Sequence, residues 1–273
     1  MGRFFAFFAV AGALVCAGSA VAQTGVLAVG DFGVGGETQR ATGEAMRRFE
    51  AAHPAQLLVT LGDNDYTRSP PAFRRNWTSS FGWLAGAGVA PAGSLGNHDV
   101  EVQGGRYEFE LLGMPRAFYR RSLPHVDIFI LNSNRVTETQ TKWLRTRLAA
   151  STARWRVVAF HHPPFSCGGH EGNATVRRVW KPLFERFGVD LVLSGHSHNF
   201  QRFAAVKGVR YVVHGGGGAR LYPLTRCPAW YPRRVAARTA RGFLYLLADE
   251  QTLRVWALNR TGTTMNTFAI QAG

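Results

Sequence analysis

Five short apolar runs, each followed by polar side chains, constrain the fold of this chain more than any other feature. They cover residues 26–29, 57–61, 89–95, 157–160 and 189–193. Near-continuous apolar runs are typical of strands that are covered on both faces. Helical patterns lie between several of these runs, at residues 37–52, 71–84, 137–150 and 175–187. Strands that alternate with helices predict a layered α/β domain whose ligands bind beyond the carboxyl ends of the strands.

The pattern changes in the last third of the chain. Strand-like segments separated by turns occupy residues 209–214, 242–248, 252–258 and 263–269. Successive short strands of this kind favour antiparallel pairing. We therefore expect them to form a second, more antiparallel sheet. No linker rich in Pro, Gly or Ser divides the chain, so we expect one domain over residues 23–273.

The polar side chains that follow the five runs are of types that bind metal ions. They are Asp31, Asp63, Tyr66, Asn97, His161, His196 and His198. Carboxylate, imidazole, amide and phenolate groups together suit borderline-hard cations. One such motif alone is typical of a turn, but the ordered occurrence of all of them at strand ends favours a metal site. Two carboxylates and three histidines are more than one ion needs, so we expect two metal ions with one aspartate between them.

The ordered motifs resemble those of the calcineurin-like metallophosphoesterase superfamily. They read Gly30-Asp31, Gly62-Asp63-x-x-Tyr66, Gly96-Asn97-His98-Asp99, Val158-x-x-His161 and Gly195-His196-x-His198. The tyrosine three residues after the second aspartate is similar to that of purple acid phosphatases, and the chain length resembles that of their small, single-domain, tartrate-resistant members. The resemblance implies an α/β fold of four layers, in which two β-sheets pack face to face and helices flank them.

The resemblance also implies a role for each ligand. Asp31, Tyr66 and His198 would hold the first metal, which is ferric iron in this family. The second metal would be divalent zinc, iron or manganese, and its ligands would be Asn97, His161 and His196. The shared ligand would be Asp63.

Three further residues have roles implied by the same motifs. His98 would face the substrate, and Asp99 would orient His98. His170 stands nine residues after His161, where the family has a second acidic histidine; an ordinary loop histidine is the alternative for this Gly-rich stretch. We expect His162 to point away from the metals, because neighbours on an extended segment face opposite ways. Asp65 replaces an apolar residue of the family pattern and would add a carboxylate near the cluster.

Together these features predict hydrolysis of phosphate monoesters by a hydroxide shared between the two metals. His98 or His170 would donate a proton to the leaving group. A phosphodiesterase or nucleotidase with the same centre is the alternative within the enzyme class, and His170 favours monoesters. A secreted polyanion-binding protein with a vestigial site is the alternative outside it. All seven ligands are present, which disfavours a vestigial site.

The chain is strongly basic, with a formal net charge of +15. Its arginines are spread along the sequence, which is typical of a solvated positive surface. Such a surface attracts small anionic substrates such as phosphate esters, and it binds nucleic acid without specificity. Charge alone does not choose between these partners, and nothing in the sequence fixes the oligomeric state.

The first residues predict export. Arg3, the apolar residues 4–16 and the small residues 20–22 form a signal peptide cleaved after Ala22. A lipid anchor on Cys16 is disfavoured, since a lipobox needs a small residue where Val15 and Leu14 stand. We therefore expect a secreted or periplasmic protein without an integral membrane segment. The sequence leaves two modifications open. Cys167 and Cys227 either form a disulfide or remain thiols. The sequence pattern for N-glycosylation occurs at Asn76, Asn173 and Asn259, where it is either used or a chance match.

Overall fold

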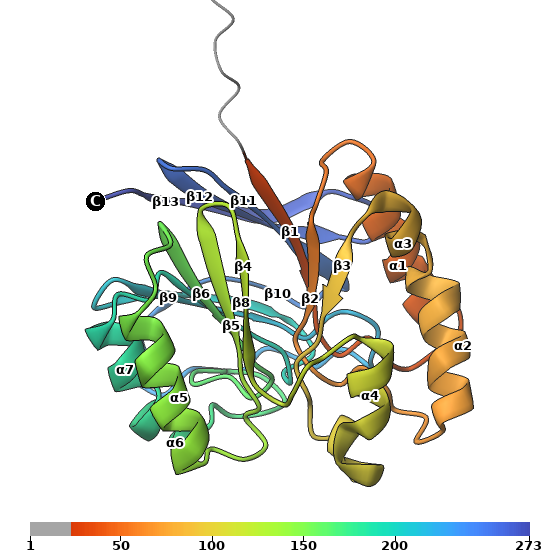
Figure 1. The fold of residues 1–273 in the computed structure, drawn as a ribbon, viewed down its shortest axis with the longest axis horizontal. Coiled ribbons are helices and arrows are strands. Elements are labelled where there is room, and N and C mark those ends of the chain that lie inside the picture. Colours follow the sequence, from red (N-terminus) through yellow and green to blue (C-terminus); the bar gives the residue numbers. More distant parts are fainter. Residues whose placement is uncertain (1–22) are drawn as a thin grey trace, which may run out of the picture.

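Two mixed β-sheets face each other in the computed structural model, which describes residues 23–273 (Figure 1). The six-stranded sheet has the order β13-β12-β11-β1-β2-β3. Its strands are β1 (Thr24–Val29), β2 (Leu57–Thr60), β3 (Ala90–Ala92), β11 (Gly242–Ala248), β12 (Thr252–Asn259) and β13 (Thr264–Gln271). The predicted signal peptide, residues 1–22, lies outside the described residues.

The seven-stranded sheet has the order β10-β8-β9-β7-β6-β5-β4. Its strands are β4 (Tyr119–Leu123), β5 (Val126–Ile130), β6 (Trp155–Ala159), β7 (Leu191–Ser194), β8 (Phe200–Val206), β9 (Val209–His214) and β10 (Arg234–Arg238). In each sheet the strands that end in predicted ligands are parallel to one another: β1 with β2 and β2 with β3 in the first, and β6 with β7 in the second.

Helices cover the outer face of each sheet, which confirms the predicted four-layer α/β fold (Figure 1). The first flank contains α1 (Gly36–Glu50), α2 (Pro70–Phe81) and α3 (Trp83–Ala87). The opposite flank contains α5 (Glu138–Ala149), α6 (Ala174–Val179) and α7 (Lys181–Arg186). Between β3 and β4 the chain forms two short 3₁₀ turns, η1 (Asp99–Glu101) and η2 (Gln103–Gly105), and α4 (Arg106–Leu111).

The apolar runs lie where two hydrophobic cores meet. In β6, Val157 and Ala159 belong to the core that lies between the sheets and under the first helical flank. Val158 and Phe160 belong to the core beneath α5, α6 and α7. Both faces of the strand are therefore covered, which is why its sequence is apolar without alternation.

The prediction of a separate C-terminal sheet is wrong. β11 pairs antiparallel with β1, and β12 and β13 extend the same sheet outward. β9 instead joins the other sheet, parallel to β7. The periodicity of a segment identifies a strand but not its partner, and here the last strands cover the open edge of β1.

Two predicted helices are each divided in the structure. The helix expected at 175–187 breaks at Trp180, and Pro182 lies in the first turn of α7, where its missing N–H is tolerated. The helix expected at 71–84 divides between α2 and α3. The helix expected at 137–150 begins as predicted, because the Thr137 hydroxyl accepts a hydrogen bond from the backbone N–H of Gln140.

Two further findings concern loops and membranes. Cys167 and Cys227, 60 residues apart, form a disulfide, which answers the question that the sequence left open. Within residues 23–273, no helix combines the length and the apolar character that crossing a bilayer requires.

The contact between α1 and α2 generates a stability prediction. A Cβ atom added at Gly43 of α1 would lie 2.1 Å from the carbonyl oxygen of Ser80 in α2, whereas one added at Gly86 of α3 would meet no atom within 4 Å. Gly43→Ala should therefore lower the free energy of unfolding by about 1–3 kcal/mol through overpacking. Gly86→Ala should raise it by about 0.5–1 kcal/mol, because alanine is the better helix former. Urea denaturation of both variants measures the two signs, and equal signs would contradict the close packing of α1 on α2.

Candidate metal centre

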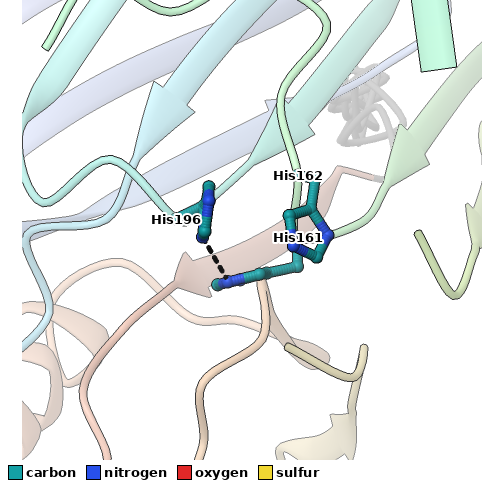
Figure 2. A group of neighbouring side chains, drawn as sticks. All are labelled: His161, His162 and His196. Atoms are coloured by element: carbon teal, nitrogen blue, oxygen red, sulfur yellow. Dashed lines mark hydrogen bonds between the residues drawn. The ribbon is translucent and has the colours of Figure 1, made fainter. Parts of the chain in front are cut away.

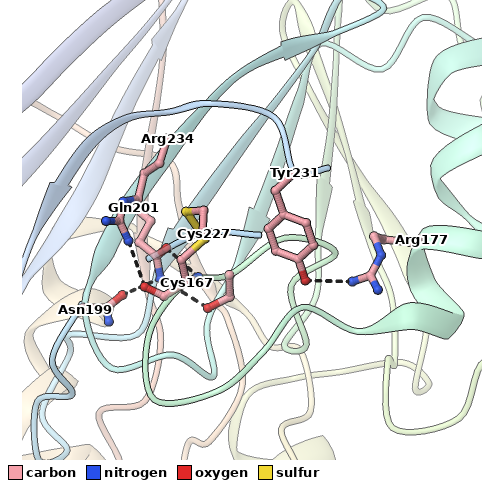
Figure 3. The surroundings of a disulfide bond; sticks show 8 residues. Cys167, Arg177, Asn199, Gln201, Cys227, Tyr231 and Arg234 are labelled. Atoms are coloured by element: carbon pink, nitrogen blue, oxygen red, sulfur yellow. Dashed lines mark hydrogen bonds between the residues drawn. A yellow bond between two sulfur atoms is a disulfide. The ribbon is translucent and has the colours of Figure 1, made fainter. Parts of the chain in front are cut away.

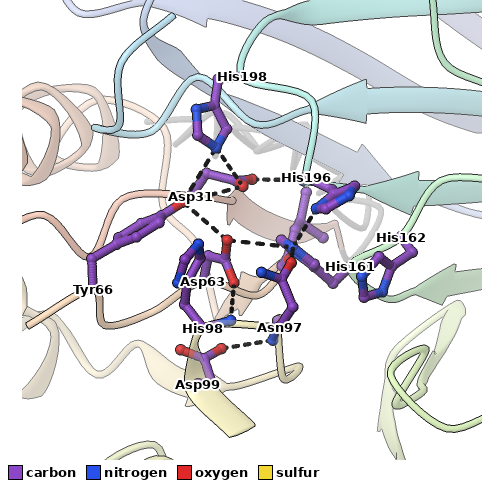
Figure 4. Close-up of polar contacts among 12 residues, drawn as sticks. Asp31, Asp63, Tyr66, Asn97, His98, Asp99, His161, His162, His196 and His198 are labelled. Atoms are coloured by element: carbon purple, nitrogen blue, oxygen red, sulfur yellow. Dashed lines mark hydrogen bonds and ion pairs between the residues drawn. The ribbon is translucent and has the colours of Figure 1, made fainter. Parts of the chain in front are cut away.

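The seven predicted ligands lie together where the carboxyl ends of the parallel strands of the two sheets meet (Figure 4). The six-stranded sheet supplies those that follow β1, β2 and β3, and the seven-stranded sheet supplies those that follow β6 and β7. Backbone hydrogen bonds join the loops that carry them: the N–H of Asp31 donates to Gly62, and the N–H of Gly195 donates to His161. Each of these bonds lies within one sheet, whereas the ligands come from both, so the complete site depends on the packing of one sheet against the other.

The first group of ligands surrounds two buried carboxylates. The Nε2 atom of His198 lies 3.2 Å from Oδ1 of Asp31, and the Tyr66 hydroxyl lies 3.0 Å from Oδ2 of Asp63. The same hydroxyl lies 3.2 Å from Nε2 of His198. Asp31, Asp63 and His198 each place one ligand atom within 4.8 Å of the others.

The second group contains two histidines and an amide. Nδ1 of His161 lies 2.8 Å from the carbonyl oxygen of Leu61 and donates its proton there, which leaves Nε2 with a lone pair. That lone pair faces Oδ1 of Asn97 at 3.1 Å and Nδ1 of His196 at 3.1 Å. It also faces Oδ2 of Asp63 at 3.5 Å. Figure 2 shows the two imidazoles directed toward one another.

Burial shifts the pKa values of side chains in both ligand groups. Asp31 is fully buried and Asp63 is 2% exposed. Burial raises the pKa of Asp31 to about 7, and it raises the pKa of Asp63 above its ordinary value. Burial lowers the pKa of His161 and of His196, and neighbouring imidazoles lower both further. The exception is His198, whose pKa the hydrogen bond and charge of Asp31 raise, so that this imidazole and this carboxylate stabilise each other.

This donor set fits metal ions. Acceptor atoms of Asp63, Asn97 and His161 face one another, and such an arrangement is favourable only with positive charge between them. The donors comprise carboxylate, phenol, amide and imidazole, which bind borderline-hard cations. Two ligand groups, joined by Asp63, match the two-ion arrangement that the sequence predicts.

Backbone geometry also marks the site. Asp31, Asp63 and His196 adopt positive φ angles of 58°, 53° and 67°. This left-handed region costs a residue other than glycine about 1 kcal/mol or more, and such residues concentrate at functional sites. The surrounding fold therefore holds three ligands in strained positions.

His98 lies beside the cluster, but Asp99 does not orient it. The ring of His98 packs on Tyr66 at a centroid distance of 4.6 Å, and its Nδ1 lies 3.3 Å from a carboxylate oxygen of Glu101. Glu101 in turn forms an ion pair with Arg68. The acidic partner of His98 is thus three residues away, one turn along η1, rather than next to it.

Asp99 stabilises the ligand loops instead. Its two carboxylate oxygens accept hydrogen bonds from the N–H groups of Asn64, Asp65 and Gly96 and from the Asn64 amide. Burial raises its pKa well above the ordinary value, and the charge of Asp63 adds to this effect. Asp99 therefore holds the loop of Asp63 against the loop of Asn97.

The structure brings His170 to the site and corrects the expectation for His162. The ring of His170 stacks on that of His196 at 4.0 Å. His162 does not point away, because its ring lies 4.5 Å from that of His196 and it belongs to a candidate ligand group with His161 and His196. β6 has ended at Ala159 and the chain bends at residues 161–162, so the alternation of an extended strand no longer applies. Nδ1 of His162 lies 2.9 Å from the Ser133 hydroxyl.

Asp65 does not extend the ligand set. Its Oδ1 accepts hydrogen bonds from the N–H and the hydroxyl of Thr67, which close a turn.

Tyr222 is a residue at the site that the sequence analysis does not predict. Its ring stacks on that of His198, with the ring centroids 4.2 Å apart.

Residues 24–200, well over half of the chain, match the family described as calcineurin-like phosphoesterase. The chain belongs to this family. Relatives of this calcineurin-like phosphoesterase include tartrate-resistant acid phosphatase type 5 of Oryctolagus cuniculus, 26% identical over 258 residues that cover 77% of this chain and 78% of that protein. The protein of the same name from Rattus norvegicus is 37% identical over 82 residues, which span 30% of this chain and 25% of the length of that curated relative.

A solved structure agrees with the fold. Purple acid phosphatase PPD1 from yellow lupin seeds has a TM-score of 0.79 and 17% identity, and the likeness covers 92% of this chain and 54% of that chain. At this identity the likeness shows the fold.

The separate contacts of Asp99 and Glu101 generate a prediction. Asp99→Ala leaves several buried N–H groups without an acceptor, so it should lower the free energy of unfolding by about 3 kcal/mol. Glu101→Ala should change it by less than about 0.5 kcal/mol, because Glu101 is partly exposed. The Glu101 variant should nevertheless lose turnover of a phosphate ester, since His98 loses its partner. Urea denaturation and steady-state kinetics measure both effects. A stable Asp99 variant would contradict the loop-holding role.

Proposed function

We propose that this protein hydrolyses phosphate monoesters at a centre of two metal ions. The observation that carries the proposal is the ligand cluster with two non-ligand histidines, His98 and His170, beside it. A monoester dianion can engage two imidazolium groups, whereas a diester carries one negative charge. The family and its named acid phosphatase relatives support the same reaction.

We infer a division of labour among the residues. Asp31, Tyr66 and His198 would hold one ion, and the other would be held by Asn97, His161 and His196. Asp63 lies between the groups and would contact both ions. Two bound cations would supply a nucleophile by acidifying water, and would neutralise charge on the phosphoryl oxygens. His98 and His170 would bind the substrate oxygens and give a proton to the leaving group.

Tyr66 supports ferric iron in the first position. Burial raises the pKa of this phenol, and the charges of Asp31 and Asp63 raise it further. Only a strongly Lewis-acidic ion binds such a phenol as phenolate. The second position, with two imidazoles and an amide, suits divalent zinc, iron or manganese.

Phosphodiesterase or nucleotidase activity at the same centre is the alternative function. Rates with an aryl monoester and the matching diester decide between them.

The predicted signal peptide and the Cys167–Cys227 disulfide support a secreted or periplasmic protein, because disulfides persist in oxidising compartments. The substrate is a small phosphate ester, attracted by the basic surface.

The proton-donor role predicts a dependence on the leaving group. His98→Ala and His170→Ala should each keep both metals and lose turnover by about 10²–10⁴-fold with an alkyl phosphate, whose leaving group needs a proton. The loss should be much smaller with p-nitrophenyl phosphate. Steady-state kinetics with both substrates measure the difference. Equal losses with the two substrates would remove both histidines from the donor role.

The ligand assignment predicts two metals per chain. Elemental analysis of purified protein should give two, and Asp63→Ala should lower the occupancy of both because Asp63 contacts both ions. Tyr66→Phe should retain metal through the other ligands, but iron-loaded protein should lose its visible phenolate-to-iron absorption. Fully active protein with one metal would overturn the binuclear proposal. Colour that survives Tyr66→Phe would remove only the ferric–phenolate assignment.

A further inference from the structure

We propose that Tyr222 is a positioning residue that fixes the rings of His198 and His170, and that the Cys167–Cys227 disulfide holds Tyr222 in place. The proposal rests on the proposed metal-binding role of His198. Tyr222 lies in the loop between β9 and β10, 24 residues after His198, and belongs to none of the metal-binding motifs.

The ring of Tyr222 contacts both histidines. It stacks on His198 with the ring planes 8° apart and the centroids at 4.2 Å. It meets His170 edge-on, at 5.2 Å and 78°. Since His170 itself stacks on His196, one aromatic side chain connects the ligands of both proposed metal positions.

The backbone around Tyr222 holds His198 as well. Nδ1 of His198 donates to the carbonyl oxygen of Arg220 at 2.7 Å. This bond leaves Nε2 as the atom that faces the cluster. The N–H of Tyr222 donates to the carbonyl oxygen of His198 at 3.0 Å. Residues 220–222 thus fix the tautomer, the ring plane and the backbone of one ligand.

The disulfide joins the two loops that carry Tyr222 and His170. Cys227 lies five residues after Tyr222, and Cys167 lies three residues before His170. Cys167 and Glu171 form an isolated antiparallel bridge that closes the short turn bearing His170. Figure 3 shows the disulfide beside Gln201 and Arg234, which hold the N–H and the carbonyl group of Cys167.

Gly169 shows how closely the two loops approach. A Cβ atom added at Gly169 would lie 2.4 Å from the ring of Tyr222. Any larger residue there must displace the ring. A methyl group at this position therefore perturbs Tyr222 without changing a ligand, a proton donor or Tyr222 itself.

The test measures Zn²⁺ binding to the metal-depleted full-length mature protein by competition with a chromogenic chelator. Tyr222→Leu removes the ring and keeps an apolar side chain, and it should weaken one of the two Zn²⁺ sites by about 10–100-fold, as loss of a partner that orients a ligand does. Tyr222→Phe keeps the ring and should bind as the wild type does. Trp230→Leu is the matched control, because Trp230 lies in the same loop and is 66% exposed; it should also bind as the wild type does.

Two further variants make the test independent of any one substitution. Gly169→Ala should weaken the same site, and adding it to Tyr222→Leu should cause little further loss, because both act through one ring. Cys167→Ser combined with Cys227→Ser should weaken that site too. In kinetics with an aryl phosphate, Tyr222→Leu should lower kcat more than it changes KM.

Undiminished Zn²⁺ affinity at both sites in Tyr222→Leu, or full additivity with Gly169→Ala, would overturn the proposal. Metal binding is measured without substrate, so this result is distinct from failure of the proposed function. Wild-type protein that binds two Zn²⁺ ions and hydrolyses no monoester would end the monoesterase proposal, and a selective loss in Tyr222→Leu would still support the positioning role.

Discussion

The site depends on one physical constraint, which is the burial of the Asp31 and Asp63 carboxylates. Each is desolvated by the fold, and burial lowers the pKa of the nearby His161 and His196, which leaves His198 as the imidazole that pairs with Asp31. Buried charge without a partner costs several kilocalories per mole, of the order of the whole stability of a domain. His198 and a few hydrogen-bond donors offset part of this cost. Bound cations would offset more of it, so metal binding and folding stability should be linked.

That cluster exists only where two sheets meet, which explains the topology around it. Three ligand-bearing strands lie in one sheet and two in the other, and β11 closes the edge of β1 that would otherwise be open. The close approach of the loops is tight: a Cβ atom at Gly195 would lie 2.5 Å from Asp31. Each ligand group draws on both sheets, so a displacement of one sheet relative to the other would pull both groups apart.

The sequence predicts the layered fold and brings the seven candidate ligands to one edge of it, but it does not predict which strands pair. The seven ligands follow strands that are apolar because both faces are covered, and such strands are recognisable without knowledge of their partners. The partners were beyond reach, because β11 pairs with β1 across more than 200 residues and no local pattern encodes that pairing. The sequence analysis does not predict β4, β5, β8 or β10. Of these, β4 and β10 lie at the sheet edges and carry arginines, so their sequences are not those of buried strands.

The errors inside the site have a common physical cause. Alternation along a strand predicts the wrong direction for His162, and the family motif predicts the wrong partner for Asp99. Neither prediction takes account of the local backbone, in which residues at strand ends lie in bends and in positive-φ conformations. The side chains that support the ligands, such as Glu101 and Tyr222, are placed by these irregular loops and carry no motif. The residues that gather at the candidate site can therefore be predicted from sequence, whereas the residues that orient them become visible only in three dimensions.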